Sequence, residues 1–174
     1  MKTNPRLFGI PIAQTWEQLG IVFENIEIYK IAVVVEIGLF LGGLADLFLL
    51  RSQFVPGFHY IGLECDAGVI NARIKTQPEI LIRDAHNSEV VSDVQARISK
   101  YAPALVYCDG GNKPLEMKLY APILRPGDFL MSHDVLIEVS EQDLVNFGIE
   151  FPYMKEINIE DHRKFGLTLW KREN

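Results

Sequence analysis

The chain has 174 residues, 48% of them hydrophobic, and it carries a formal net charge of -6. This length and apolar content suffice for one domain with a substantial core, so we expect a single domain over residues 1–174. The acidic balance, without any run of like charges, weighs against general binding to nucleic acid or anionic membranes, which requires basic clusters.

The N-terminal sequence lacks the continuous apolar stretch and small-residue cleavage site of a secretory signal, so the cytoplasm is the expected compartment. Cys65 and Cys108 each lie in an apolar run without metal-type spacing, and we expect both to be buried free thiols. A membrane span over residues 31–50 would place Glu36 and Asp46 in hydrocarbon, at roughly 2.5–3.5 kcal/mol each. We therefore expect no membrane partner, and we interpret Asp46 as a polar residue early in a helix.

The first predicted elements are a helix and a buried strand. Thr15 and Gln18 have the spacing of a capping box, and apolar residues then recur at helical intervals. Residues 31–38 are continuously apolar up to Glu36 and rich in β-branched side chains, which is typical of a strand buried on both faces of a parallel sheet. Gly42 and Gly43 then open a second apolar helix.

The same order of strand and helix repeats downstream. Strands are predicted at 58–66, 78–86, 103–111 and 128–136, and helices at 67–75, 88–101, 114–124 and after Ser140. This alternation predicts a doubly wound α/β fold. The last two strand-like runs, 153–160 and 164–172, lie close together and predict an antiparallel pair that closes one edge of the sheet.

Acidic side chains stand at the ends of five consecutive predicted strands. They are Glu36, Glu64 with Asp66, Asp84, Asp109, and Asp134 with its neighbour His133. In an open α/β sheet the ligand binds beyond the carboxyl ends of the strands. The pattern therefore indicates a polar cofactor, with a carboxylate at the second strand end that accepts ribose hydroxyls. Any one of these acids alone could equally cap the next helix or face solvent.

The glycine turn leaves the identity of the cofactor open. It reads G-L-F-L-G-G from residue 38, which is not the G-x-G-x-x-G of a dinucleotide-binding turn. Glu64 nevertheless lies at about the distance after the glycines that a ribose contact in an NAD enzyme requires. An NAD-dependent enzyme therefore remains one of three hypotheses.

Four segments carry motifs of a known family. LFGIPIAQT looks like L-G-x-P-I-x-Q, VVEIGLFLGG resembles V-E-I-G-T-x-x-G-G, and YIGLECD matches an acidic second-strand motif. Residues 105–134 resemble D-G-G-H followed by Y-x-x-L-x-x-P-G-D and a terminal H-D. Nearly the whole chain thus resembles the class I S-adenosylmethionine-dependent methyltransferases, closest to the cephalosporin hydroxylase-like and rhamnosyl O-methyltransferase-like branch and more distantly catechol O-methyltransferase. The resemblance implies a seven-stranded Rossmann-like sheet with an antiparallel last strand, preceded by an N-terminal helix.

The resemblance also implies how S-adenosylmethionine would be bound. Glu36, Gly38 and Gly42 would surround the amino acid portion of the cofactor. Glu64 would hold the ribose hydroxyls, and Asp84 would lie at the adenine end. The cofactor-binding residues implied are Glu36, Gly38, Gly42, Glu64, Asp84 and Asp109.

In metal-dependent relatives, acids at the ends of the fourth and fifth strands hold a divalent ion that binds the acceptor oxygen. The matching residues here are Asp109, His133 and Asp134, so the resemblance makes Mg²⁺ a candidate second cofactor. His133 could instead act as a general base, which makes Asp109 and His133 the catalytic candidates. The activity implied is O-methylation of a hydroxyl of a small molecule or sugar.

Three positions depart from the family pattern. Asn112 replaces a histidine and cannot take up a proton at neutral pH, while Leu39 and Leu44 make the cofactor turn more apolar. These departures support a second hypothesis, a catalytically degenerate member of the fold that binds a nucleotide or protein partner. The chain also leaves little room for a lid over the acceptor, which a neighbouring subunit of a homo-oligomer could provide.

Overall fold

The computed structural model describes residues 5–157 and 159–174. Its strands are β1 (Arg6–Leu7), β2 (Ile10–Pro11), β3 (Val33–Ile37), β4 (His59–Glu64), β5 (Ile80–Ile82), β6 (Ala104–Cys108), β7 (Phe129–Ser132), β8 (Met154–Ile157) and β9 (Thr168–Arg172). Its helices are α1 (Trp16–Ile28), α2 (Gly43–Phe54), α3 (Ala72–Lys75), α4 (Ser88–Ile98), α5 (Lys113–Tyr120), α6 (Glu141–Glu150) and α7 (Ile159–Arg163), with a 3-10 turn at Ala121–Ile123.

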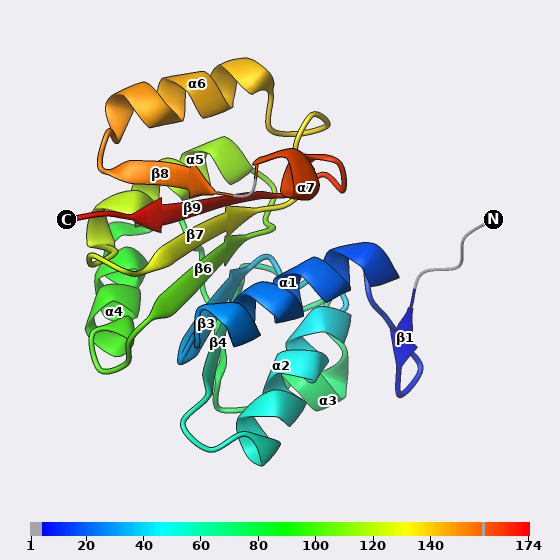
Figure 1. The fold of residues 1–174 in the computed structure, drawn as a ribbon. Helices are drawn as coiled ribbons and strands as arrows, with labels where there is room; N and C mark the ends of the chain where they lie inside the picture. The colour runs from blue at the N-terminus through cyan, green and yellow to red at the C-terminus, as the bar shows by residue number, and fades with distance from the viewer. Residues whose placement is uncertain (1–4, 158) are drawn as a thin grey trace.

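The predicted doubly wound sheet is confirmed. Seven strands pair in the order β5-β4-β3-β6-β7-β9-β8, and helices lie on both faces of the sheet (Figure 1). Strands β3 to β7 are parallel, whereas β9 runs antiparallel to both β7 and β8. The last strand is thus antiparallel, as the family resemblance implies. Helix α1 precedes the sheet, and a short β1–β2 hairpin precedes the helix.

The apolar run around β3 lies at the centre of the sheet and joins its two cores. Val33, Val35 and Ile37 face one cluster, which helices α4, α5 and α6 cover, while Val34 faces the cluster under α1 and α2. This explains why the run does not alternate between apolar and polar residues. Within the described residues, no helix has the length and apolar character that crossing a membrane requires.

Local signals set the helix boundaries. The Thr15 hydroxyl accepts from the backbone N–H of Gln18, and the Gln18 side chain accepts from the N–H of Thr15, which completes the predicted capping box of α1. Ser140 and Asp143 form the same arrangement at α6. One helix and one strand differ from the prediction. The helix expected at 67–75 is reduced to α3, and the strand expected at 153–160 ends at Ile157, after which the unpredicted short helix α7 follows.

The shortened helix explains two corrections at the end of β4. Asp66 accepts from the N–H of Gly68 in a turn, and Asn71 rather than Asp66 caps α3. Cys65 lies in the same loop and is exposed, so the prediction that it is buried is wrong, whereas Cys108 in β6 is buried as expected. Strand β4 ends at Glu64, so Cys65 lies beyond the sheet.

Asp46 is more than a polar residue at the start of a helix. It is fully buried in the first turn of α2, where its carboxylate bonds to the guanidinium of Arg73 in α3. A buried carboxylate requires such a partner, because removing it from water is costly. The pair therefore fastens the short helix α3 to the helix that follows the glycine turn.

Candidate active site

The carboxyl ends of the parallel strands enclose a cleft of about 720 Å³. Nearly all the predicted site residues line it: Glu36, Gly38, Glu64, Asp84, Asp109, His133 and Asp134. The exception is Gly42, which caps α2 while its neighbour Gly43 lines the cleft. Residues from five strand ends are thus brought together, as the topology of an open α/β sheet requires.

Two glycines shape the turn after β3 through close approaches of backbone to backbone. Gly38 has φ +82°, and a β-carbon there would lie 2.5 Å from the Cα of Gly110 in the turn after β6. A β-carbon at Gly43 would lie 2.2 Å from the carbonyl oxygen of Pro11. The turn is therefore clamped between the end of β6 and the N-terminal segment. Leu39 and Leu44 are buried, so the departures from the family pattern are apolar residues packed into the core.

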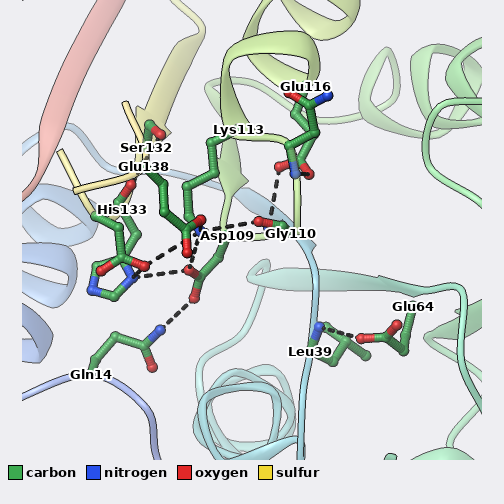
Figure 2. A network of polar contacts seen from close by, with 12 residues as sticks. Gln14, Leu39, Glu64, Asp109, Gly110, Lys113, Glu116, Ser132, His133 and Glu138 are labelled. Carbon is green, nitrogen blue, oxygen red and sulfur yellow. Dashed lines mark hydrogen bonds and ion pairs between the residues drawn. The ribbon is translucent and has the colours of Figure 1, made fainter. Parts of the chain in front are cut away.

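Glu64 at the end of β4 holds the glycine turn through backbone amides. Its Oε2 accepts from the N–H groups of Leu39 and Phe40, at 3.0 and 3.2 Å, as Figure 2 shows for Leu39. Its Oε1 accepts from the N–H of Asp66 at 3.0 Å. The carboxylate thus ties the ends of β3 and β4 together and lies on the wall of the cleft.

Glu36 faces the same side of the sheet but is buried. Its carboxylate accepts a hydrogen bond of 2.6 Å from the hydroxyl of Tyr60. Burial raises the pKa of Glu36 well above its ordinary value, and the nearby charges of Asp109 and Glu64 raise it further. A cationic group entering the cleft would relieve this unfavourable burial.

Asp109 lies at the centre of the other side of the cleft. Its Oδ2 accepts from the side-chain amide of Gln14, and its Oδ1 lies 2.9 Å from Nδ1 of His133 (Figure 2). Burial raises the pKa of Asp109, although the hydrogen bond and charge of His133 oppose the shift. The partner Gln14 comes from the N-terminal segment and could be found only through the motif that contains it.

His133 directly follows β7 and is almost completely buried. Its Nδ1 faces Asp109, whereas its Nε2 has no hydrogen-bond partner within the described structure. Burial lowers the pKa of His133, but the hydrogen bond to Asp109 and the charges of Asp109 and Asp134 outweigh it, and the net shift is upward. Nε2 is therefore the ring nitrogen that is left without a hydrogen-bond partner in the described structure, and it is shielded from solvent.

Lys113 is the main site residue that the sequence prediction missed. Its side chain is only 3% exposed, yet its ammonium lies 2.6 Å from Glu138, 3.4 Å from Asp134 and 3.8 Å from Asp109. It also donates to the carbonyl of Gly110 at 3.0 Å. Burial lowers the pKa of Lys113, but the three carboxylates raise it by more. One weak sequence signal was present, since a lysine at the first position of a helix is disfavoured by the helix dipole and is stabilised by acids nearby.

The three metal candidates do come together. Asp109, His133 and Asp134 each offer one ligand atom, and these atoms lie within 4.8 Å of one another. Two carboxylates and an imidazole are donor types that suit a divalent ion. Asp134 is held in place by an unusual backbone, with φ +55°, and its carbonyl accepts from three amides of the turn that leads to Glu138 and Val139.

The end of the cleft beside Asp84 is more open. Asp84 lies beyond β5, has a side chain 64% exposed, and accepts from the N–H of His86. Glu116, which the sequence prediction also missed, is buried nearby and accepts from the N–H groups of Gly110 and Asn112. Burial raises the pKa of Glu116. Asn112 itself caps α5 through its side-chain oxygen, which explains what this residue does in place of the family's histidine.

Comparison by sequence identifies no relative, since no family model and no curated protein matches the chain. Comparison by structure identifies several similar proteins. A structure of CmcI without ligand superposes with a TM-score of 0.76 at 14% identity, over 99% of this chain and 77% of that one. A further CmcI structure is a complex with Mg and SAM.

Two other solved structures extend the comparison. A methyltransferase from Silicibacter pomeroyi matches with a TM-score of 0.57 at 19% identity, over 90% of this chain and 91% of its own. MycE, from the mycinamycin biosynthetic pathway and in complex with Mg and SAH, matches with a TM-score of 0.60 at 14% identity, over 94% of this chain and 51% of its own. At these identities the likeness concerns the fold. This chain thus has the fold of the S-adenosylmethionine-dependent methyltransferases, in agreement with its resemblance to the cephalosporin hydroxylase-like branch.

Proposed function

We propose that the protein is an S-adenosylmethionine-dependent O-methyltransferase that acts on a hydroxyl of a small molecule or sugar, with the cytoplasm as the expected compartment. The observation that carries the proposal is the composition of the cleft. One side presents a glycine turn and the carboxylate of Glu64, and the other presents the paired Asp109 and His133. Solved structures with this fold contain SAM or SAH, which supports the choice of cofactor.

On the cofactor side, each acid has a group to recognise. Glu64 would accept from the two ribose hydroxyls, replacing the amide bonds that it now receives from the turn. Glu36 would offset the cationic amino group, which its buried carboxylate favours. Gly38 and Gly42 would shape the turn around the amino acid portion of the cofactor. Asp84 would lie at the adenine end, and Asp109 would lie between the cofactor and the acceptor.

On the acceptor side, the residues would take up the proton that the acceptor hydroxyl releases. S-adenosylmethionine supplies, when bound, a methyl group activated by a positively charged sulfur. Methyl transfer to an acceptor hydroxyl would release the hydroxyl proton. His133 would take up this proton, and Asp109, which lies against its Nδ1, would stabilise the resulting imidazolium. Because the pKa of His133 is raised, this step favours alkaline pH.

The donor atoms, taken alone, would allow Mg²⁺ as a second cofactor. Asp109, His133 and Asp134 would hold it, with His133 then a ligand rather than the base. Such an ion lowers the pKa of an acceptor hydroxyl and orients its oxygen. A neighbouring subunit in a homo-oligomer would complete the wall around the acceptor.

Isothermal titration with S-adenosylhomocysteine tests the cofactor assignment. Wild-type protein should release heat at one site, and Glu64→Ala should weaken binding by about tenfold to a hundredfold, the effect of losing hydrogen bonds to a charged group. Glu89→Ala, which removes an exposed acid from α4 outside the cleft, is the matched control and should bind normally. No heat from wild-type protein at high micromolar concentration would overturn the proposal.

The degenerate alternative also has a structural observation in its favour. Asn112 serves as a helix cap and Leu39 is packed into the core, so both family positions have structural roles here. Binding of S-adenosylhomocysteine without methyl transfer to a broad panel of hydroxyl compounds would favour this second function.

A further inference from the structure

The cluster that resembles a metal site already contains a positive charge. Lys113 places its ammonium beside Asp109 and Asp134, which are two of the three metal candidates, and closer still to Glu138. Figure 2 shows Lys113 extending into this group from the start of α5, between the elements that carry Asp109 and Glu138. The third metal candidate, His133, shares Asp109 and Asp134 with the lysine.

The fold holds the ammonium there from several directions. The carbonyl of Gly110 accepts from Nζ at 3.0 Å, and Glu138 accepts at 2.6 Å. Glu138 is itself positioned by its backbone N–H, which donates to the carbonyl of Asp134 at 2.8 Å. A buried ammonium is stable only when paired in this way, and the same contacts keep it from withdrawing into solvent.

A divalent ion bound to Asp109, His133 and Asp134 would lie within a few ångströms of this ammonium. Like charges at such a distance repel strongly in a buried site, since an effective dielectric constant of about 20 screens them only weakly. The carboxylates are also already neutralised in part, so the ion would gain less from them. The donor atoms fit a metal ion, but the charge beside them opposes one.

We propose that Lys113 is the resident cation of this cluster, and that a divalent ion binds there only when the charge of Lys113 is removed. The inference rests on the proposed function for its consequence, which is that methyl transfer proceeds without added magnesium. Its test is a binding measurement that needs neither cofactor nor acceptor. Titration with S-adenosylhomocysteine is a separate experiment, so failure of one proposal is distinguishable from failure of the other.

The probe is Mn²⁺ followed by electron paramagnetic resonance on the full chain after treatment with a chelator, with Mg²⁺ as competitor. Wild-type protein should leave the signal of free Mn²⁺ nearly unchanged up to about millimolar concentration, which is weak binding for a protein site. Lys113→Met should bind one Mn²⁺ about a hundredfold more tightly, because one repelling unit charge is gone. Adding Asp109→Asn to that variant should abolish the gain.

Two control variants distinguish the effect of the charge at position 113 from the effect of losing any lysine of α5 or of changing the side chain. Lys118→Met removes a lysine from the same helix that pairs with Glu150 outside the cluster, and it should behave like wild type. Lys113→Arg keeps the charge and should also leave Mn²⁺ free. Tight binding of one Mn²⁺ by wild-type protein, displaced by Mg²⁺, overturns the proposal.

A folded Lys113→Met that binds no more tightly than wild type overturns the proposal equally. If circular dichroism shows that this variant is unfolded, the double variant Lys113→Met with Glu138→Gln replaces it. Glu138 is the acid closest to the lysine, and the second substitution prevents it from being left as an unpaired charge. The double variant keeps all three candidate donors, and the same increase in affinity is expected of it.

Discussion

The two sides of the cleft are built in different ways. The proposed cofactor side, formed by the ends of β3, β4 and β5, is held by backbone: Gly38 lies against Gly110, and the amides after β3 donate to Glu64. The proposed acceptor side, formed by the ends of β6 and β7, is held by side-chain charges around Asp109 and Lys113. The first arrangement depends on shape and the second on charge balance. Substitutions should therefore damage the two sides by different mechanisms.

The largest expected effect is a change of shape on the cofactor side. Gly38→Ala would strain a backbone at φ +82° and drive a β-carbon into the turn after β6, so we expect a loss of roughly 3 kcal/mol or more in the free energy of unfolding. Gly57→Ala is the matched control, because Gly57 has φ +81° with nothing within 4 Å. It should lose only about 1 kcal/mol, from strain alone. Urea unfolding measures both.

Equal losses in the two glycine variants would contradict the close approach of the turns. They would show that backbone strain accounts for the whole effect.

A change of charge should have a smaller effect of opposite sign. Glu36→Gln removes a buried carboxylate while keeping an oxygen for the hydroxyl of Tyr60, so we expect the ligand-free protein to gain on the order of 1 kcal/mol at pH 8. Because burial raises the pKa of Glu36 in the folded state, the native protein binds this proton more readily than the unfolded chain. The wild-type stability due to this group therefore falls as pH rises from the unfolded pKa to the raised folded pKa.

Urea unfolding at a series of pH values checks this sign. The gain in the free energy of unfolding from Glu36→Gln should grow with pH and then level off. A difference that does not change with pH, or a less stable variant at pH 8, would show that ionised Glu36 does not destabilise the folded protein.

The smallest effect concerns the cap that places Lys113. Asn112→Ala removes the side-chain oxygen that accepts from the N–H of Leu115, and we expect a loss of about 0.5 kcal/mol by thermal or urea unfolding. Asn87→Ala, which removes the corresponding cap of α4 outside the acceptor side, should cost about as much. Only the Asn112 variant should also alter the titration of His133 seen by NMR, because it loosens the start of α5. An unchanged His133 would show that the acceptor side does not depend on this cap.

The fold was largely predictable because its signals are local. The buried run before Gly38, the capping box at Thr15 and the alternation of strand and helix each reflect the chemistry of a few adjacent residues. The errors arose where a local signal was ambiguous. Cys65 falls within the strand predicted at 58–66, but that strand ends at Glu64, two residues before the predicted end, and Cys65 is exposed in the loop.

The site was predictable only in part, for the same physical reason. Strand-end acids such as Glu64 and Asp109 follow recognisable strands, so topology alone brings them together. Lys113 and Gln14 carry only weak signals, because their positions depend on contacts between segments that the sequence separates widely. The charge balance of the acceptor side is a property of the assembled fold.

The contact between Gln14 and Asp109 also has a consequence for the order of folding. It joins residues 95 positions apart, whereas most of the cofactor side is closed by shorter loops. Long loops lose more entropy on closure, so such contacts tend to form late. The bond between Gln14 and Asp109 requires β6 to be in place, because Asp109 directly follows β6. The same N-terminal segment also contacts the glycine turn at Gly43, so we expect both sides of the cleft to be completed late in folding, when this segment docks.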